Sequence, residues 1–402
     1  MGLFRNSEIS GDSWYHGYKI QLFPTEEQKE FFDKCIDVCR FMYNWTIEQE
    51  NNQLKLFDKK KVDEKFINIY QLSKKYTQLR KELDFVGSVP YTSGRSGLER
   101  ACKAYLACFR KIFRKPRFKS KKKCKTNSFG TRCDRMFFED NMLKIEGLDT
   151  MIYTKYHSGY DRKFRKFKNP VVSRDNMDNY FISFCLVEPK PLEYFEANNI
   201  KPFNRAIGID VNVKKRFVLS TGEIFYAPDL SKEINKLKEK ERKVQKDVRR
   251  RRNMERTNPL KNCQSKRSTK RLRSMQKQAK HIANINENFT QQITKKIIDM
   301  RPKAIVMETL DITKVEKSSH FIARHTHLAS LGRCVVVMKN KANKYNIPFI
   351  QAEKGFKSTQ ICSSCGNVQK MELWQKTYKC PHCGLVIDRD INAALNLEHL
   401  VV

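Results

Sequence analysis

The sequence lacks any long apolar run. Across 402 residues, no uninterrupted hydrophobic stretch approaches the roughly 20 residues that a transmembrane helix needs, and no secretory signal pattern is present. We therefore expect no membrane partner. Acidic residues are also scarce beside basic ones, 44 against 80, which gives a formal net charge of +36. Because such a surplus repels itself unless a polyanion neutralises it, the composition indicates a nucleic-acid partner.

The thirteen cysteines fall into two groups. Two Cys-x-x-Cys pairs, Cys362/Cys365 and Cys380/Cys383, are separated by fourteen residues. Four thiolates at this spacing are typical of one closed, tetrahedral Zn²⁺ site that holds structure rather than doing chemistry. The alternative, two disulfides of a small secreted scaffold, suits a long basic chain poorly. The remaining cysteines are scattered and indicate a reducing compartment, so we expect a cytoplasmic, nucleoid-associated protein if the source is prokaryotic.

Three acidic residues stand at the ends of apolar patterns. Asp210 lies near the end of the strand pattern 205–211, Glu308 lies near the end of a second pattern at 303–310, and Asp390 opens an apolar helix pattern. A helix cap is the plain interpretation of Asp390. Charged side chains are costly to bury unpaired, so such residues are usually ligands or members of buried pairs. Three together can hold two Mg²⁺ ions about 4 Å apart, which activate water and stabilise the leaving oxygen of a phosphodiester.

These motifs resemble a known family. The stretches 208–210 (Gly-Ile-Asp), 306–308 (Val-Met-Glu) and 388–394 (Asp-Arg-Asp-Ile-Asn-Ala-Ala), with the cysteine pairs, are similar to the split RuvC nuclease and zinc ribbon of TnpB proteins. TnpB proteins are transposon-encoded RNA-guided nucleases related to compact type V CRISPR effectors. Two departures are visible: Asn212 stands where the family usually has Gly, and Asn286 where many relatives carry Arg.

The resemblance implies the catalytic residues. Asp210, Glu308 and Asp390 would form the metal-binding triad, and Asp390 is chosen over Asp388 because the family's third Asp directly precedes x-Asn-Ala-Ala. Two catalytic Mg²⁺ ions and one structural Zn²⁺ are the cofactors that follow.

In the N-terminal half, stretches of alternating apolar and polar residues predict a small antiparallel β-barrel. A strand pattern at 18–23 and alternating stretches within 128–188 supply its strands, and the resemblance implies that helices of about 25–115 are inserted in it. Such a domain would read a short DNA motif beside the target and grip the guide RNA. The candidate readers lie in the loops 87–95 and 124–131 and are Arg95, Asn127 and Ser128.

Two basic segments add candidate phosphate contacts. One follows a helix pattern that Pro116 stops, and Phe118 is interleaved with its charges. The other, 231–280, contains four consecutive arginines, and we favour a nucleic-acid clamp over a solvated helical hairpin or a nuclear-localisation signal. For the first segment, which follows Pro116, the alternative to phosphate contact is a solvated run of charges. The predicted contacts are Lys111, Arg114, Arg117, Lys119, Arg249, Arg250, Arg251 and Arg252.

The predicted fold class is a multidomain α+β protein with an N-terminal β-barrel-like domain and a C-terminal RNase H-like (RuvC) α/β domain that carries an inserted zinc ribbon. The predicted order is a flexible leader (1–15), the recognition domain (16–188), a linker (189–202), a split nuclease (203–361 and 385–402) with a basic helical insertion (about 231–280), and the ribbon (362–384).

The hypothesis for function is an RNA-guided DNA endonuclease that cleaves target DNA next to a short flanking motif. Its partners would be a guide RNA and double-stranded target DNA, with a monomer favoured. A compact type V CRISPR effector with an array-derived guide is the first alternative. A non-cleaving RNA-guided repressor is disfavoured because all three carboxylates are intact. An unguided junction-resolving nuclease would leave the basic N-terminal half without a purpose.

Overall fold

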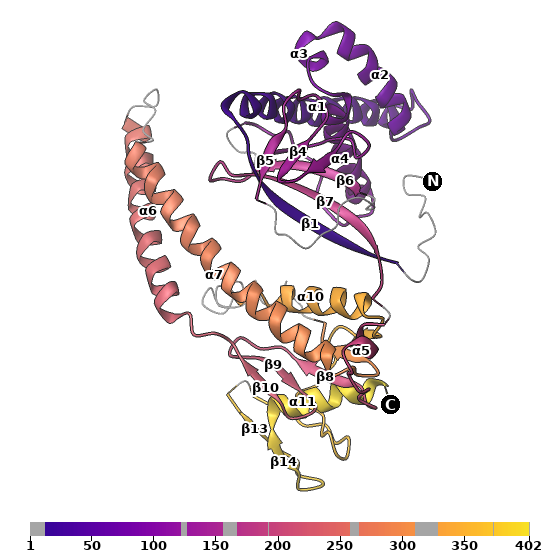
Figure 1. The fold of residues 1–402 in the computed structure, drawn as a ribbon, viewed down its shortest axis with the longest axis vertical. Coiled ribbons are helices and arrows are strands. Elements are labelled where there is room, and N and C mark those ends of the chain that lie inside the picture. The colour runs from indigo at the N-terminus through magenta and orange to yellow at the C-terminus, as the bar shows by residue number, and fades with distance from the viewer. Residues whose placement is uncertain are drawn as a thin grey trace. The chain divides into compact units, whose positions relative to one another are not determined.

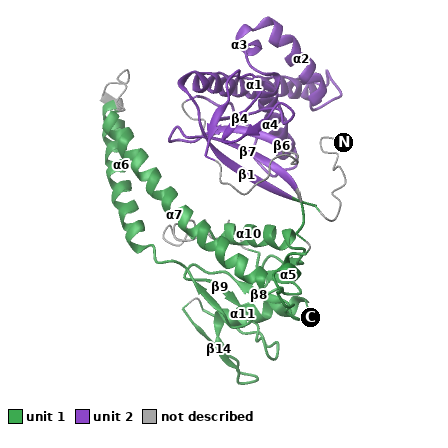
Figure 2. Cartoon of the chain, in the orientation of Figure 1, with its two compact units in different colours: residues 1–14, 189–402 green, residues 15–188 purple. Residues whose placement is uncertain are grey.

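The computed structural model divides the chain into two compact units, residues 15–188 and residues 1–14 with 189–402 (Figures 1 and 2). Most of the predicted leader 1–15 lies outside the described residues. None of the helices within the described ranges combines the length and hydrophobicity of a membrane span. The structure describes residues 13–121, 127–155, 167–191, 193–257, 265–309, 329–372 and 374–401.

The unit of residues 15–188 is built on a seven-stranded sheet with the order β2-β6-β7-β1-β5-β4-β3. The predicted strands are present, and β2 and β3 stand at the ends of this order, so closure into a barrel stays a prediction. Its strands are β1 (Ser13–Phe23), β2 (Asn127–Gly130), β3 (Phe137–Glu139), β4 (Met142–Lys144), β5 (Ile152–Thr154), β6 (Phe167–Arg174) and β7 (Tyr180–Pro189).

Four helices accompany this sheet: α1 (Glu26–Asp58), α2 (Ile69–Glu82), α3 (Asp84–Gly87) and α4 (Tyr91–Phe109). A capping box begins α1, because Thr25 Oγ1 accepts from the Gln28 N–H at 3.3 Å while Gln28 Oε1 accepts from the Thr25 N–H at 3.0 Å. The aromatic side chains of α1 belong to the core, where Phe32 is fully buried and Phe31, Phe41 and Trp45 pack against the cluster.

The predicted turn-rich loop 87–95 is wrong in its second half, because α4 begins directly after Pro90. Two glycines of α4, Gly94 inside this range and Gly97 just beyond it, allow close packing rather than a turn. A Cβ at Gly97 would lie 2.0 Å from the Cys39 carbonyl oxygen of α1, and a Cβ at Gly94 would lie 2.3 Å from the Tyr76 hydroxyl. Close approach between helices therefore decides the conformation that composition alone assigned to a loop.

The second unit holds a five-stranded sheet with the order β10-β9-β8-β11-β12. Three of these strands form an antiparallel meander, since β8 pairs with β9 and β9 with β10. β11 lies parallel to both β8 and β12. A separate pair, β13 and β14, follows in the cysteine-rich region. The strands are β8 (Ile207–Asp210), β9 (Lys215–Leu219), β10 (Ile224–Tyr226), β11 (Ile305–Met307), β12 (Phe349–Gln351), β13 (Thr377–Lys379) and β14 (Val386–Asp388).

Helices pack on this sheet and extend from it. The basic segment forms two helices that pack along one another, α6 (Ser231–Thr257) and α7 (Lys266–Asp299), and the C-terminal part of α7 packs on α10 (Leu331–Lys344) (Figure 1). α11 (Arg389–Glu398) packs on β8 and ends in a short 3₁₀ turn (His399–Val401). The predicted linker 189–202 contains α5 (Tyr194–Ala197), whose Phe195 is buried in this unit's core.

Candidate active site and metal centre

The topology of the sheet brings the three predicted carboxylates to one place. Asp210 is the last residue of β8, and Glu308 directly follows β11. Because β8 and β11 are adjacent and parallel, with Met307 opposite Ile209, both side chains leave the sheet at the same edge. Asp390 is the second residue of α11, the helix that packs on β8.

Gly208 sets how closely α11 approaches β8. A Cβ at this position would lie 1.9 Å from the Ala394 carbonyl oxygen and 2.5 Å from the Glu398 nitrogen. Only glycine leaves room for the helix backbone to lie directly on the strand. This contact holds α11 against β8, and Asp390 lies at the start of the same helix.

The electrostatics of the centre call for a cation. Asp210 is 4% exposed, and its pKa is raised to about 8, first by burial and then by the negative charges of Glu308 and Asp390. Burial also raises the pKa of Glu308. The amide of Asn212 opposes this by donating to Asp210 Oδ2 at 2.7 Å. Buried carboxylates that repel one another, with oxygen as the only donor type, fit a hard divalent cation such as Mg²⁺.

Asp388, not Asp390, is the helix cap. Its Oδ1 accepts from the N–H groups of Asp390 at 2.9 Å and Ile391 at 3.3 Å, and its Oδ2 lies 2.6 Å from Lys215 Nζ. The Asp390 carboxylate is therefore not used for capping, and it lies 7% exposed beside Lys215. The family motif likewise selects Asp390, rather than Asp388, as the predicted metal ligand.

The two departures from the family pattern have local explanations. Asn212 is not among the positive-φ residues of the described chain, so this position does not require glycine, and its side chain donates a hydrogen bond to Asp210. Asn286 is 3% exposed in α7 and accepts from Arg216 of β9 at 3.4 Å. It is a buried partner of that arginine rather than a surface group.

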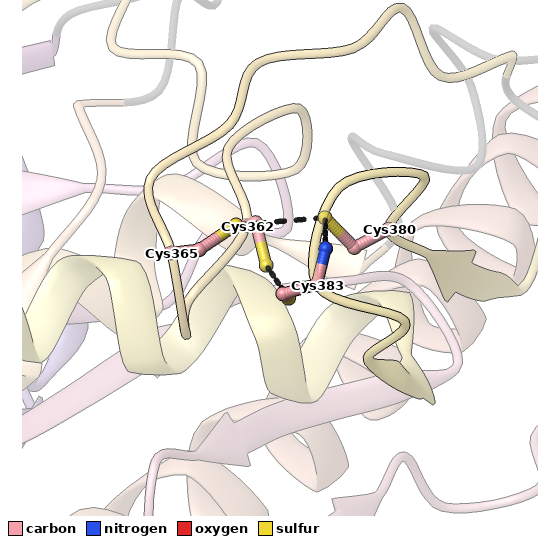
Figure 3. Close-up of side chains that lie close together, drawn as sticks. All are labelled: Cys362, Cys365, Cys380 and Cys383. Carbon is pink, nitrogen blue, oxygen red and sulfur yellow. Dashed lines mark hydrogen bonds between the residues drawn. The ribbon is translucent and has the colours of Figure 1, made fainter.

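The four cysteines form a second, closed cluster (Figure 3). The Sγ atoms of Cys362 and Cys383 lie 3.6 Å apart, as do those of Cys365 and Cys380. A tetrahedron with Zn–S bonds of about 2.3 Å has edges of about 3.8 Å, whereas a disulfide bond is only about 2.05 Å long. The backbone N–H groups of Cys383 and His382 lower the pKa of the Cys380 thiol, which favours the metal-binding thiolate at that position, whereas loss of hydration and hydrogen bonds with the other thiols raise the pKa of Cys365 against the Asn367 N–H.

The ligand atoms of the carboxylate centre are spaced more widely than those of the cysteine cluster. Among the described residues, the four cysteines are the one group of three or more His, Cys, Asp or Glu donors whose ligand atoms all lie within 4.8 Å of one another. The donor sets therefore match different ions: sulfur converging on one point for zinc, and spread oxygens for Mg²⁺-like cations.

Comparison with known proteins agrees with these features. One family model, the Cas12f1-like TNB domain, matches residues 332–397, and a helix-turn-helix domain model matches residues 15–59, which here hold β1 and α1. A putative RNA-guided DNA endonuclease of Streptomyces pristinaespiralis is 24% identical over 94% of this chain and 88% of that protein. The TnpB-like protein L79 of Acanthamoeba polyphaga mimivirus is 23% identical over 94% of this chain and 72% of that protein. The resemblance to the TnpB family is confirmed.

The fold is also similar to that of a solved structure. The cryo-EM structure of a Cas12f1–sgRNA–target DNA complex superposes with a TM-score of 0.55 at 14% identity, over 93% of this chain and 83% of that one. The mixed α/β fold is thus shared with a compact effector.

The candidate nucleic-acid residues of this TnpB-like chain take different positions. Arg95 lies in α4, not in a loop, and its Nε donates to Glu99 at 3.0 Å. Asn127 and Ser128 lie in β2, where Arg100 donates to the Ser128 carbonyl oxygen at 2.9 Å and to its hydroxyl at 3.1 Å. Residues 122–126 of the predicted loop lie outside the described residues.

Residues of α1 contact the cationic segment that follows α4. Asn44 of α1 makes two hydrogen bonds with the backbone of Lys119, at 2.8 and 2.9 Å, and Lys119 Nζ lies 3.8 Å from the centre of the Tyr43 ring. Phe118 is 62% exposed. The exposed members of the predicted contact set are Lys111, Arg114, Arg117, Arg249, Arg250 and Arg252, while Arg251 is half-buried.

Two asparagines that the sequence analysis did not assign join α11 to the first cysteine knuckle. Asn392 accepts from the Ser363 N–H at 2.9 Å and donates to the Ile361 carbonyl oxygen at 2.7 Å. Asn396 donates to the carbonyl oxygens of Ser358 at 2.8 Å and Ile361 at 2.7 Å. Both are buried. The helix that carries Asp390 is thereby fixed to the ribbon, and the only sequence signal was two asparagines four residues apart in an apolar helix.

Proposed function

We propose that the protein is an RNA-guided DNA endonuclease, which cleaves target DNA beside a short flanking motif at a RuvC-type centre of Asp210, Glu308 and Asp390. The observation that carries this proposal is the meeting of three acidic side chains, from two adjacent parallel strand ends and one helix start, in a chain of net charge +36. The sheet order β10-β9-β8-β11-β12, an antiparallel meander followed by parallel strands, supports an RNase H-like fold. The names of its relatives support the guided activity.

The residues divide the work of hydrolysis. Two Mg²⁺ ions would activate the attacking water and stabilise the leaving oxygen. Asp210, Glu308 and Asp390 would hold these ions. Asn212 orients the Asp210 carboxylate through its 2.7 Å hydrogen bond. The cysteine cluster would hold one structural Zn²⁺, which has no open coordination position when all four thiolates bind.

The partners of this function are a guide RNA and double-stranded DNA. In such systems base pairing reads the sequence, while the protein holds the backbone and reads a short flanking motif. The exposed cations of α6 and of the segment 110–121 provide phosphate contacts. Phe118, exposed among these charges, provides an apolar surface on which a base can stack.

The test begins with the RNA that copurifies when the protein is expressed with its own genomic flanks. That complex is then given a target beside a randomised flank, with Mg²⁺. We expect a discrete RNA and cleavage that Asp210→Asn abolishes, whereas Asp63→Asn, an exposed aspartate in the other unit, cleaves normally. Guided binding without cleavage in the unmodified protein would indicate a repressor. The absence of a discrete RNA, with cutting of branched DNA, would overturn the guided function.

A compact CRISPR effector is the second candidate, because the Cas12f1 complex shares the fold at a TM-score of 0.55. The chemistry would be identical, so cleavage does not separate the two. The origin of the copurified RNA does: a transposon end indicates the TnpB context, and a repeat-spacer array indicates the CRISPR context.

A further inference from the structure

Lys215 contacts the carboxylate centre through Asp390, although no motif pointed to it. Its Nζ is 2.6 Å from Asp388 Oδ2 and 3.3 Å from Asp390 Oδ2, and its side chain is 22% exposed. It is the first residue of β9, which has a strand on each side, and it pairs with Tyr226 of β10. A cation is therefore held on a central strand, next to a predicted metal ligand, and still open to solvent.

Asp388 fixes the position of this ammonium group. One Asp388 oxygen accepts two N–H groups of α11, so the carboxylate is locked to the helix. The other oxygen then holds Lys215 Nζ. A lysine ammonium has three N–H donors, and Asp388 and Asp390 take two of them. A third donor remains for a ligand that enters from the open side of the centre.

A simple ion pair between β9 and α11 explains only part of this arrangement. The ammonium contacts both the cap, Asp388, and the predicted ligand, Asp390. A divalent cation that binds Asp390 competes with this ammonium for the same oxygen. When the cation takes this oxygen, Lys215 stays bound to Asp388 but loses its contact with Asp390. A second N–H donor of Lys215 is then free, at the place where a phosphodiester would meet the cations.

We propose that Lys215 is a further catalytic residue that binds the scissile phosphate, and that it occupies Asp390 until the metal and substrate arrive. This inference rests on the proposed function. It does not apply to Lys214, whose exposed side chain precedes β9 and which therefore serves as a matched control.

The experiment compares Lys215→Met, Lys215→Arg and Lys214→Met in the full chain with its RNA. With saturating Mg²⁺, we expect the single-turnover cleavage rate of Lys215→Met to fall at least tenfold. Lys215→Arg should recover part of this loss, because it keeps the charge. Lys214→Met should cleave as the unmodified protein does. Affinity for guide RNA and target DNA, measured without divalent cations, should stay unchanged.

A second readout does not depend on cleavage. Mn²⁺ binding to the DNA-free protein, followed by electron paramagnetic resonance, should require a lower concentration in Lys215→Met, because the competing ammonium is gone. An unchanged cleavage rate, or a Mn²⁺ affinity that falls together with the melting temperature, would overturn the proposal and leave a structural ion pair.

The two proposals fail separately. If the unmodified protein cuts no DNA, the proposed nuclease function is wrong, yet the Mn²⁺ titration still decides whether Lys215 competes for Asp390. If the unmodified protein cuts and Lys215→Met cuts equally well, only the role of Lys215 is lost.

Discussion

The four cysteines come from two short knuckles within residues 362–383, whereas the three carboxylates come from positions 210, 308 and 390. The cysteine ligand atoms converge within 4.8 Å through local turns. The carboxylates meet because β8 and β11 are neighbours and α11 lies on Gly208. A site built from nearby residues requires only its own turns to form, so the spacing of its ligands in the sequence is enough to predict it. A site assembled by topology depends on every contact that sets the helix on the sheet.

The largest effect should come from removing the zinc. Cys380→Ser is expected to abolish metal binding by the cluster, since structural zinc in small domains is worth about 10–16 kcal/mol. Because Asn392 and Asn396 join this ribbon to α11, cleavage should be lost too. Zinc content by metal analysis should be one ion per chain in the unmodified protein and in Cys133→Ser, an exposed cysteine outside the cluster. Full zinc content in Cys380→Ser would contradict the assignment.

Gly208→Ala should separate the two sites. The new methyl group would meet the Ala394 carbonyl oxygen and push α11 from β8, at a cost of roughly 1–3 kcal/mol or more. We expect cleavage to fall to background while zinc content stays at one per chain. Gly17→Ala, whose Cβ would meet nothing within 4 Å, is the control. Retained cleavage would show that the strand and helix can move apart without cost to the site.

Asn392→Ala should weaken the joint between the sites without destroying either. It leaves the Ser363 N–H and the Ile361 carbonyl oxygen without this partner, which costs about 1–3 kcal/mol for each buried group left unsatisfied. Cleavage should decrease and zinc should remain. Thermal unfolding measures the loss, with Asn52→Ala, an exposed asparagine of α1, as the control. An unchanged melting temperature would show that the Asn392 hydrogen bonds between α11 and the ribbon do not stabilise the protein.

Glu50 is a buried acid that belongs to neither the cysteine cluster nor the carboxylate centre, so it shows what burial does to a carboxyl group. It is fully buried in α1, accepts from the Ile67 N–H at 3.3 Å, and burial raises its pKa to about 7. Because this pKa exceeds the unfolded value near 4.5, Glu50 contributes stability that is complete below pH 4.5 and is lost as the pH rises through about 7. Glu50→Gln should flatten this part of the melting-temperature profile, with or without Mg²⁺. A slope that disappears on adding Mg²⁺ would tie it to the carboxylate centre instead.

The sequence predicted those features that depend on local spacing or on a charge within an apolar pattern. The Cys-x-x-Cys pairs and the acidic ends of two apolar strands are of this kind. It missed Lys215, because one lysine among many carries no sign of a partner 173 positions later. It misplaced Arg95, because Gly94 looks like a turn residue until its close contact with Tyr76 of α2 is known. The assignment of domains and site roles remains a prediction.

The contact between Gly208 and α11 also orders events during synthesis. Asp210 and Glu308 emerge from the ribosome well before Asp390, and the helix that covers Gly208 is made after both of the strands that it meets at the centre. Domains generally fold as they emerge, N-terminal first. The unit of residues 15–188 can therefore fold while the carboxylate centre is still missing one of its three acids, so a nascent chain holds this folded unit before the three carboxylates can come together.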